Sequence, residues 1–354
     1  MGVHVLKEFL DNYNGKAYCA IRDRKNLTAK QRLNILFEFY FSCLPDEKYK
    51  GRIEVINVDI NSDDAQEKLS AVKADTVINC AACVDYVKNY EFMYKANVET
   101  VNNLIDLCLR SNKKLIHVST ISVYGYGNPD KTNYKIAENK LYFGQVFDDS
   151  YTATKFTAER NILESIVDKS LDAKIIRLGN LIGRYNDGAL QINLASNGFL
   201  KTFWAFSKLG LFCEEEVDKQ IEFSPINNVA DSILKIAKAN HNLCIWHSFD
   251  VNTISVRSVV DVLKSKGIKL NLVSSDKIID YYLNNIDGKH KDAKLIALIL
   301  YPLKYPQYDF FENNNMNPDH SYNVLQKLNF NWPQITEEYL KKLFEYAIGL
   351  GYFD

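Results

Sequence analysis

The segment KLIHVST (114–120) is a short, mostly apolar run that ends in two hydroxyl side chains. A continuous apolar run of this length is typical of a parallel β-strand that is buried on both faces, so it predicts a strand over 114–120. The next regular segment, within DDSYTATKFTAERNIL (148–163), has the helical period and predicts a helix over 151–167. A strand followed by a helix is the repeating unit of an α/β fold.

The same alternation continues on both sides of this unit. Further strands are predicted at 16–22, 53–59, 75–82 and 173–179, and helices at 29–41, 65–72 and 92–109. The repetition predicts an α/β fold of the Rossmann type, a doubly wound parallel sheet covered by helices on both faces. Beyond 183 the rhythm weakens to a helix within 186–209, an extended piece at 220–226, a helix at 228–239 and a strand at 247–251.

This change of rhythm predicts two parts. We assign 1–182 and 220–253 to a Rossmann-like core that binds NADP, and 183–219 and 254–354 to a smaller, mostly helical lobe that faces the substrate or carrier. The beginning departs from the pattern, because GVHVLKEFL (2–10) reads as a helix with no strand before it. Only Gly2 stands where a glycine-rich phosphate turn would end, so we expect the first strand and that loop to be missing by truncation.

Composition excludes several classes of protein. The formal net charge of -1 gives no electrostatic reason to expect nucleic acid or an anionic membrane as partner. The seven cysteines are an odd number without disulfide spacing, which favours a reduced, cytoplasmic protein. No apolar run approaches the roughly 20 residues that span a bilayer, and the first residues do not resemble a signal peptide.

Tyr151 and Lys155 are four residues apart, which places both side chains on one face of the predicted helix. A tyrosine hydroxyl has a pKa near 10, and a neighbouring ammonium lowers that pKa toward the range that proton transfer needs. A chance Tyr-x-x-x-Lys is the alternative, since the chain has 22 tyrosines.

Thr120 ends the predicted strand at 114–120, at the edge of the sheet where ligands bind in such folds. Its hydroxyl is placed to donate to a carbonyl oxygen that gains negative charge as hydride arrives. Ser119 and Ser122 compete for that role, and a hydroxyl that only caps a turn is the alternative. We predict Thr120, Tyr151 and Lys155 as a catalytic trio.

The order of motifs resembles the terminal thioester reductase domains of nonribosomal peptide synthetases, which belong to the extended short-chain dehydrogenase/reductase superfamily. HVSTISVYG (117–125), YTATK (151–155), RLGNLIGRYNDG (177–188) and the ending NFNWPQITEEYLKKLFEYAIGLGYF (329–353) carry the resemblance. It spans nearly the whole chain, and the last two segments narrow it to thioester reductases.

The resemblance implies that NADPH supplies hydride to an acyl or peptidyl thioester held on the phosphopantetheine arm of a carrier protein. The carrier is expected upstream in the same synthetase, and the reductase itself is expected to be a monomeric domain. Reduction releases an aldehyde, with the alcohol as the product of a second round. The residues that match the family's catalytic trio are Thr120, Tyr151 and Lys155.

Cofactor contacts are predicted at the strand ends. Arg22 and Arg24, with Arg32 on the next helix, suit a ribose 2′-phosphate and favour NADPH, although Asp23 among them leaves the choice ambiguous. The remaining predicted contacts are Asp59 and Ile60 beside the adenine, Gly2 at the phosphates, Ala81 and Ala82 against the cofactor, and Lys155 at a ribose hydroxyl.

Cys80 and Cys83 form a C-x-x-C that suits half a zinc site or a redox pair. Without a second pair or a histidine at ligand spacing, we predict no metal and assign this stretch to close approach of the cofactor. Asn97 is expected either to bond backbone near the site or to lie on a helix surface, and His117 to pack in the core. Five C-terminal tyrosines line a pantetheine channel or simply pack: Tyr281, Tyr282, Tyr301, Tyr305 and Tyr308.

Two other functions remain open from the sequence. The first is an extended short-chain dehydrogenase that acts on a free small molecule, of the nucleotide-sugar epimerase, dehydratase or steroid dehydrogenase kind. The second is a non-catalytic relative that lost its phosphate loop and binds partners.

Overall fold

The computed structural model describes residues 1–84, 88–125, 137–286, 292–304 and 318–354. Two compact units divide the chain. The first unit comprises Met1–Gly179, Val229–Ser248 and Met316–Asn331, and the second comprises Asn180–Asn228, Phe249–Asn315 and Trp332–Asp354. Each is described by itself. Among the described residues, no helix is both long enough and apolar enough to cross a bilayer.

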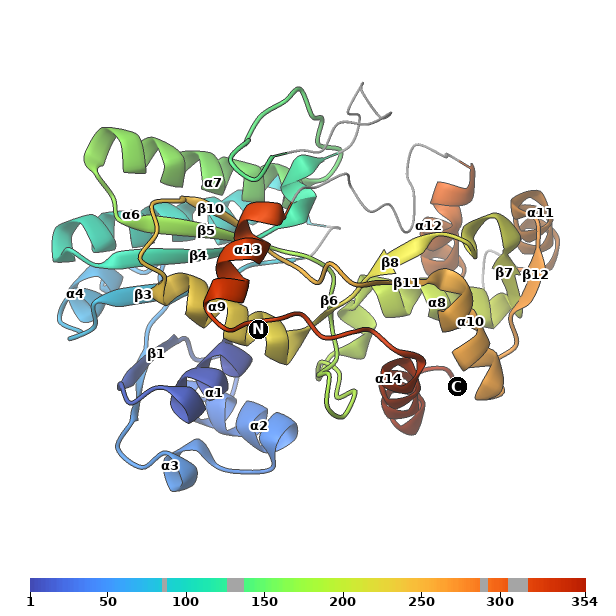
Figure 1. The fold of residues 1–354 in the computed structure, drawn as a ribbon, viewed down its shortest axis with the longest axis horizontal. Helices are drawn as coiled ribbons and strands as arrows, with labels where there is room; N and C mark the ends of the chain where they lie inside the picture. The colour runs from blue at the N-terminus through green and yellow to red at the C-terminus, as the bar shows by residue number, and fades with distance from the viewer. Residues whose placement is uncertain (85–87, 126–136, 287–291, 305–317) are drawn as a thin grey trace. The chain divides into compact units, whose positions relative to one another are not determined.

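Parallel strands form the centre of the first unit (Figure 1). Four of them are hydrogen-bonded in the order β10-β5-β4-β3, namely Ile245–Ser248, Ala173–Leu178, Lys114–Thr120 and Thr76–Asn79. A separate parallel pair joins β1 (Ala17–Ile21) to β2 (Ile53–Asn57). The predicted parallel α/β fold is therefore confirmed, and the predicted strand at 114–120 is observed over those residues.

Helices alternate with these strands along the chain. Figure 1 shows α6 and α7 on one face of the four-stranded sheet and α9 on the other. The helices that lie in this unit or enter it are α1 (Gly2–Asn12), α2 (Ala29–Phe41), α3 (Pro45–Lys48), α4 (Ala65–Ser70), α5 (Tyr90–Tyr94), α6 (Thr100–Ser111), α7 (Ser150–Lys169), α9 (Ile226–Lys238) and α13 (Asp319–Lys327). The predicted helix at 92–109 is interrupted, because a π-helical segment at Lys95–Glu99 separates α5 from α6.

Apolar side chains of the strands and helices meet in this unit as the sequence periods require. Leu115 and Ile175 of the sheet are fully buried against Leu104, Ile105 and Ile162 of α6 and α7. A smaller cluster under β1 and β2 contains Leu10, Leu33, Phe37 and Tyr49. Burial of such side chains stabilises the unit by roughly 1.5–3 kcal/mol each.

The second unit is built from short strand pairs and helices. The pairs are β6 (Leu181–Ile182) with β9 (Ser224–Pro225), β8 (Gln220–Glu222) with β11 (Thr253–Ser255), and β7 (Leu211–Cys213) with β12 (Asn271–Val273). The helices are α8 (Gly198–Leu209), α10 (Val256–Ser265), α11 (Ser275–Asn285), α12 (Ala293–Lys304) and α14 (Glu337–Gly349). Its core is rich in aromatic side chains, including Phe203, Phe206, Phe212 and Phe344.

Four segments lie in the opposite unit from the one that the sequence predicted, namely 180–182, 220–228, 249–253 and 316–331. Residues 220–228 belong to the second unit, because β8 pairs with β11 in an antiparallel ladder there. Residues 316–331 belong to the first unit, where the Ser321 hydroxyl accepts a hydrogen bond of 2.9 Å from the backbone N–H of His247 in β10. Pairings between residues far apart in the sequence account for the placements of 220–228 and 316–331.

The part of the RLGNLIGRYNDG segment that lies in the second unit, 180–188, packs against α14. Gly188 has φ +70°, and a Cβ there would lie 2.5 Å from the carbonyl carbon of Lys342. The Tyr339 hydroxyl donates to the backbone oxygen of Gly183 at 2.8 Å, and its ring stacks on Tyr185. The two segments that narrow the resemblance are therefore in contact, and the glycine at 188 permits that close approach.

Candidate active site

Thr120 and Tyr151 come together at the carboxyl end of β4. Thr120 ends the strand, and its Oγ1 accepts a hydrogen bond of 3.1 Å from the backbone N–H of Ser122, which begins a short 3₁₀ turn at Ile121–Tyr124. Tyr151 lies in the first turn of α7, whose start is capped by Asp149 accepting from the backbone N–H of Thr152 at 2.8 Å. A side-chain hydrogen bond joins the hydroxyls of Tyr151 and Thr120.

Burial raises the pKa of Tyr151 to about 12, whereas the hydrogen bond with Thr120 acts in the opposite direction. The sequence predicted a pKa lowered by Lys155. Instead, Lys155 Nζ binds elsewhere, at 2.9 Å from the backbone oxygen of Val118 and 3.0 Å from His117 Nε2. Tyr151 is therefore a protonated phenol over the ordinary pH range, which suits a proton donor.

Lys155 is almost completely buried, with 2% of its surface exposed. Burial lowers its pKa to about 8, and Glu159 and Cys80 act to raise it. Tyr151 and Lys155 lie on one face of α7 as predicted, since both are buried against the sheet side of the helix.

Two polar side chains near Lys155, those of His117 and Asn79, were not predicted from the sequence as site residues. His117 of β4 is opposite Asn79 of β3 in the parallel register, and Asn79 Nδ2 lies 3.1 Å from His117 Nδ1. His117 is buried, as expected for a core residue, but it contacts the lysine rather than only apolar neighbours. The sequence signal for a polar contact was a histidine within an otherwise apolar strand. Only the position of α7 in the structure shows that its partner is Lys155.

A buried ion pair engages Ser119, one of the three hydroxyls near the end of β4. Ser119 donates to Glu159 Oε1 at 2.5 Å, and Arg177 of β5 donates to both oxygens of that carboxylate. Arg177 also donates to the Tyr124 hydroxyl at 2.6 Å. Ser119 is thus occupied by the carboxylate, and the Thr120 hydroxyl donates to Ser122 Oγ at 3.0 Å.

The predicted 2′-phosphate residues gather after β1. The Arg32 guanidinium donates to the backbone oxygen of Arg22. Its pKa is lowered, first by burial and then by the charges of Arg24 and Arg22. Three cationic groups from a loop and α2 therefore share one locality, as an anionic ligand requires.

Asp23 has both carboxylate oxygens occupied within the protein. One accepts from the backbone N–H of Ala29 at 2.7 Å, and the other accepts from Asn57 Nδ2 at 2.9 Å. A carboxylate held in this way is a structural group that orders the loop between β1 and α2.

The other predicted cofactor residues are placed as follows. Asp59 forms a 2.8 Å ion pair with Arg22, which lowers the pKa of the Asp59 carboxyl, rather than standing alone at the strand end. Ile60 packs against the core of the first unit. Ala81 and Ala82 are exposed after β3, and a Cβ on Gly2 would lie 3.5 Å from that of Cys80.

Asn97 ties the loop after β3 to α7. Its Oδ1 accepts from the backbone N–H of Cys83 at 2.8 Å, and its Nδ2 donates to the Cys83 oxygen and to Thr154 Oγ1, each at 3.1 Å. The first of the two expectations for Asn97, a bond to backbone near the site, is confirmed. The described part of the chain gathers no group of three His, Cys, Asp or Glu side chains that could hold a metal ion.

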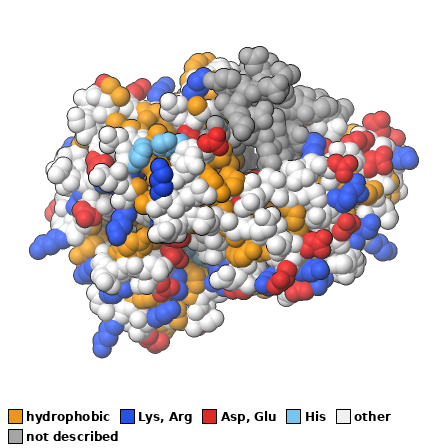
Figure 2. Space-filling view, in the orientation of Figure 1, with side chains coloured by type: hydrophobic (Ala, Val, Ile, Leu, Met, Phe, Trp, Pro, Cys, Tyr) orange, Lys and Arg blue, Asp and Glu red, His pale blue; other side chains and the backbone are white. Residues whose placement is uncertain are grey.

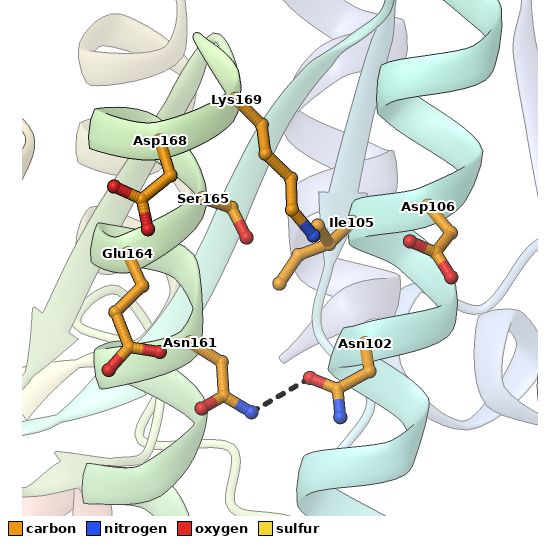
Figure 3. Close-up of a pocket in the computed structure, with 8 residues that line it drawn as sticks. All are labelled: Asn102, Ile105, Asp106, Asn161, Glu164, Ser165, Asp168 and Lys169. Carbon is orange, nitrogen blue, oxygen red and sulfur yellow. Dashed lines mark hydrogen bonds between the residues drawn. The ribbon is translucent and has the colours of Figure 1, made fainter.

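A pocket on the outer side of the first unit lies between α6 and α7 (Figure 3). Asn161 donates to Asn102 at 2.8 Å across it, and the remaining lining side chains are Ile105, Asp106, Glu164, Ser165, Asp168 and Lys169. It contains none of the predicted catalytic residues. On the molecular face that Figure 2 shows, basic and acidic side chains are interspersed, in keeping with the small net charge.

The predicted tyrosine cluster is only partly described. Tyr305 and Tyr308 lie outside the described residues. Tyr282 donates to the backbone oxygen of Ala293 at 2.8 Å, whereas Tyr281 and Tyr301 are exposed.

Two buried carboxyls form a second polar cluster, in the second unit. Glu222 accepts from the backbone N–H of Asn180 at 2.7 Å and from the Ser224 hydroxyl, and Ser224 in turn accepts from the backbone N–H of Asp250 at 2.9 Å. Burial raises the pKa of both Glu222 and Asp250 to about 7. Sequence analysis singled out neither residue.

Comparison with known proteins adds independent findings. Residues 1–233 match the family model described as male sterility protein, an NAD-binding domain. A linear gramicidin synthase protein of Brevibacillus parabrevis is 21% identical over 99% of this chain, and the chain spans 7% of that protein's length.

Two solved structures are similar over the whole chain. A thiolation-reductase di-domain from an archaeal non-ribosomal peptide synthetase has a TM-score of 0.87 at 31% identity, covering 100% of this chain and 74% of that chain. The reductase domain of the aureusimine biosynthetic cluster has a TM-score of 0.79 at 25% identity, covering 99% of this chain and 88% of that one.

Proposed function

This chain belongs to the male sterility protein family of NAD-binding domains, and from that premise we propose that it is an NADPH-dependent thioester reductase. Its substrate is an acyl or peptidyl chain bound as a thioester to the phosphopantetheine arm of a carrier protein. Its product is the aldehyde, or the alcohol after a second reduction. Similarity to a thiolation-reductase di-domain over the full chain supports this substrate class.

The observation that carries the proposal is the hydroxyl pair at the end of β4. Thr120 and Tyr151 are hydrogen-bonded to each other, and Lys155 is buried one helical turn after Tyr151. Two hydroxyl donors at the carboxyl end of a parallel strand are suited to an oxygen that becomes negatively charged.

Each residue has a distinct chemical role in this proposal. NADPH, when bound, supplies a hydride to the thioester carbonyl carbon. Thr120 and Tyr151 stabilise the oxyanion that develops on the carbonyl oxygen, and Tyr151 then transfers its phenolic proton to it. The carbon–sulfur bond of the resulting hemithioacetal breaks, which restores a carbonyl as the aldehyde and releases the pantetheine thiol. Lys155, one helical turn after Tyr151, is proposed to assist this proton transfer when it is positively charged.

The cluster after β1 supports NADPH over NADH. Arg22, Arg24 and Arg32 offer three guanidinium groups, and guanidinium matches phosphate geometry. Selection of NADH would require a free carboxylate for the ribose 2′-hydroxyl, whereas the two oxygens of Asp23 accept from Ala29 of α2 and Asn57 of β2.

A carrier-bound thioester assay with Tyr151→Phe tests the proposal. We expect wild-type protein to oxidise NADPH in the presence of an acyl-carrier thioester, and the variant to lose that activity by about 100-fold or more, because the proton donor is absent. Tyr142→Phe is the matched control, since Tyr142 is 69% exposed and packs its ring on Phe156.

Undiminished turnover by Tyr151→Phe would contradict the assignment of the proton donor. Turnover of UDP-sugars or sterols without turnover of the carrier thioester would instead favour a dehydrogenase that acts on free small molecules.

A further inference from the structure

A chain of hydrogen bonds through three buried side chains connects the loop after β3 with Lys155. The backbone N–H of Ala81 donates to Asn79 Oδ1 at 3.0 Å, Asn79 Nδ2 lies 3.1 Å from His117 Nδ1, and His117 Nε2 lies 3.0 Å from Lys155 Nζ. The three side chains, Asn79, His117 and Lys155, are 4%, 1% and 2% exposed. Bulk water therefore does not satisfy their polar atoms, and the proton positions must agree along the chain.

The backbone end of the chain determines those proton positions. A backbone N–H can only donate, so Ala81 requires the carbonyl oxygen of the Asn79 amide on its side. The amide nitrogen of Asn79 then faces His117 and donates to Nδ1. A neutral imidazole carries one proton, so in His117 that proton is on Nε2 and points at Lys155 Nζ.

An amine can accept a hydrogen bond from the Nε2–H group of His117, whereas an ammonium cannot. A lysine ammonium has three hydrogens and no lone pair. Lys155 Nζ already donates to the Val118 oxygen at 2.9 Å, and as an amine it keeps a lone pair for the Nε2–H of His117. If Lys155 gained a proton, the proton of His117 would have to move from Nε2 to Nδ1, and the side-chain amide of Asn79 would have to rotate. The NH₂ group of Asn79 would then face the backbone N–H of Ala81, so two donors would oppose each other.

We propose that His117, oriented by Asn79, is a positioning residue that stabilises the amine form of Lys155 over the ammonium form. The gain of a proton by Lys155 is thereby coupled to the tautomer of His117 and to the hydrogen bond that holds the Ala81 loop. The proposed reduction mechanism by itself gives neither Asn79 nor His117 a role.

The groups around Lys155 are consistent with this coupling. His117 faces it from β4, Cys80 from the loop after β3, and Glu159 from its own helix. Burial lowers the pKa of Lys155 to about 8, and burial and the charge of Lys155 hold the pKa of His117 well below its usual value. Glu159 opposes the shift, but its carboxylate is bound by Arg177 and Ser119.

The catalytic consequence rests on the proposed function, whereas the hydrogen-bond chain does not. If the ammonium of Lys155 assists proton donation by Tyr151, the rate declines as pH rises through the Lys155 pKa. Asn79→Asp reverses the bias, because a carboxylate requires Nδ1–H on His117 and leaves Nε2 to accept from an ammonium. Asn79→Ala removes the constraint without adding a charge.

Nuclear magnetic resonance of the full chain tests the tautomer directly. With ¹⁵N-histidine and ¹³Cε-lysine labels, the signals are assigned by their loss in His117→Gln and Lys155→Met. Above the Lys155 transition we expect the Nε2–H tautomer of His117 in wild type and the Nδ1–H tautomer in Asn79→Asp. The buried His247, which contacts the Tyr124 hydroxyl, is the internal control and keeps its tautomer.

A titration of Lys155 provides the second readout. Its transition is expected to move up by one pH unit or more in Asn79→Asp and in the same direction, by less, in Asn79→Ala. The descending limb of kcat/KM for NADPH oxidation moves with it. An Nδ1–H tautomer in wild type above the transition, or an unmoved transition in both variants, overturns the proposal.

These outcomes are independent of the substrate. If no variant reduces a carrier thioester while the tautomer and the lysine transition behave as expected, the thioester reductase function fails and the coupling stands. If wild type reduces the carrier thioester but its His117 tautomer is Nδ1–H, the coupling fails and the thioester reductase function stands.

Discussion

Arg177 and Glu159 form an ion pair in which both side chains are completely buried, with Nη2 and Oε2 2.7 Å apart. The pair joins β5 to α7. Glu159 also accepts from the Ser119 hydroxyl, and Arg177 donates to the Tyr124 hydroxyl. Arg177 begins the RLGN motif, so one role of that motif is to attach α7 to the sheet.

Removal of one partner of this pair should destabilise the first unit strongly. Arg177→Ala leaves Glu159 charged and uncompensated, so we expect a loss of about 3–5 kcal/mol in the free energy of unfolding by urea. Arg160→Ala is the control on the same helix, because the Arg160–Glu164 pair is exposed and contributes about 0.5 kcal/mol or less. Equal effects of the two substitutions would contradict the structural role of the buried pair.

Cofactor preference should depend on the arginine cluster after β1. Arg24→Ala is expected to raise the Kd for NADPH about tenfold or more, since a hydrogen bond to a charged group contributes about 1.5–3 kcal/mol. The Kd for NADH should change little, and titration of intrinsic fluorescence measures both.

Lys30→Ala provides the comparison for charge alone, because Lys30 lies on α2 and pairs with Asp46. A parallel loss of NADPH and NADH affinity in Arg24→Ala would argue against a 2′-phosphate contact.

The contact between Gly188 and α14 predicts a local steric effect. Gly188→Ala combines a φ of +70° with a Cβ 2.5 Å from the Lys342 carbonyl carbon, so the backbone of the second unit must shift. We expect a loss of about 2 kcal/mol or more, detectable as a lower Tm. Gly349→Ala, at the end of the same helix, meets no atom within 4 Å and should leave Tm nearly unchanged.

The carboxyl cluster of the second unit predicts a stability that falls with pH. Because burial raises the folded-state pKa of Asp250 to about 7, the folded state binds this proton more tightly than the unfolded chain does. That contribution is complete below the unfolded pKa near 4 and is lost as pH rises through 7, at about 1.4 kcal/mol per pKa unit.

Asp250→Asn should flatten the decline between pH 5 and 8, measured as urea midpoints across that range. The exposed Asp218, paired with Arg257, is the control, and Asp218→Asn should retain the wild-type slope. A wild-type stability that rises from pH 5 to 8 more steeply than that of Asp250→Asn would contradict the buried-acid interpretation.

Local sequence determined the strand at 114–120, the parallel sheet and the helix that carries Tyr151 and Lys155, because apolar period and residue spacing are properties of neighbouring residues. The sequence placed the hydroxyls of Thr120 and Tyr151 at the same edge of the sheet, and a hydrogen bond joins them there. The same reasoning predicted that Arg22, Arg24 and Arg32 form a group of cationic side chains.

Tertiary structure alone decided what each polar group contacts. Asn79, His117 and Lys155 come from β3, β4 and α7, and no spacing within one segment predicts that register and helix placement bring them within hydrogen-bond distance. Burial then reversed the expected pKa shift of Tyr151, since removal of water outweighed the hydrogen bond with Thr120. Residues 220–228 and 316–331 lie in a different unit from the predicted one, because their hydrogen-bond partners are far away in the sequence.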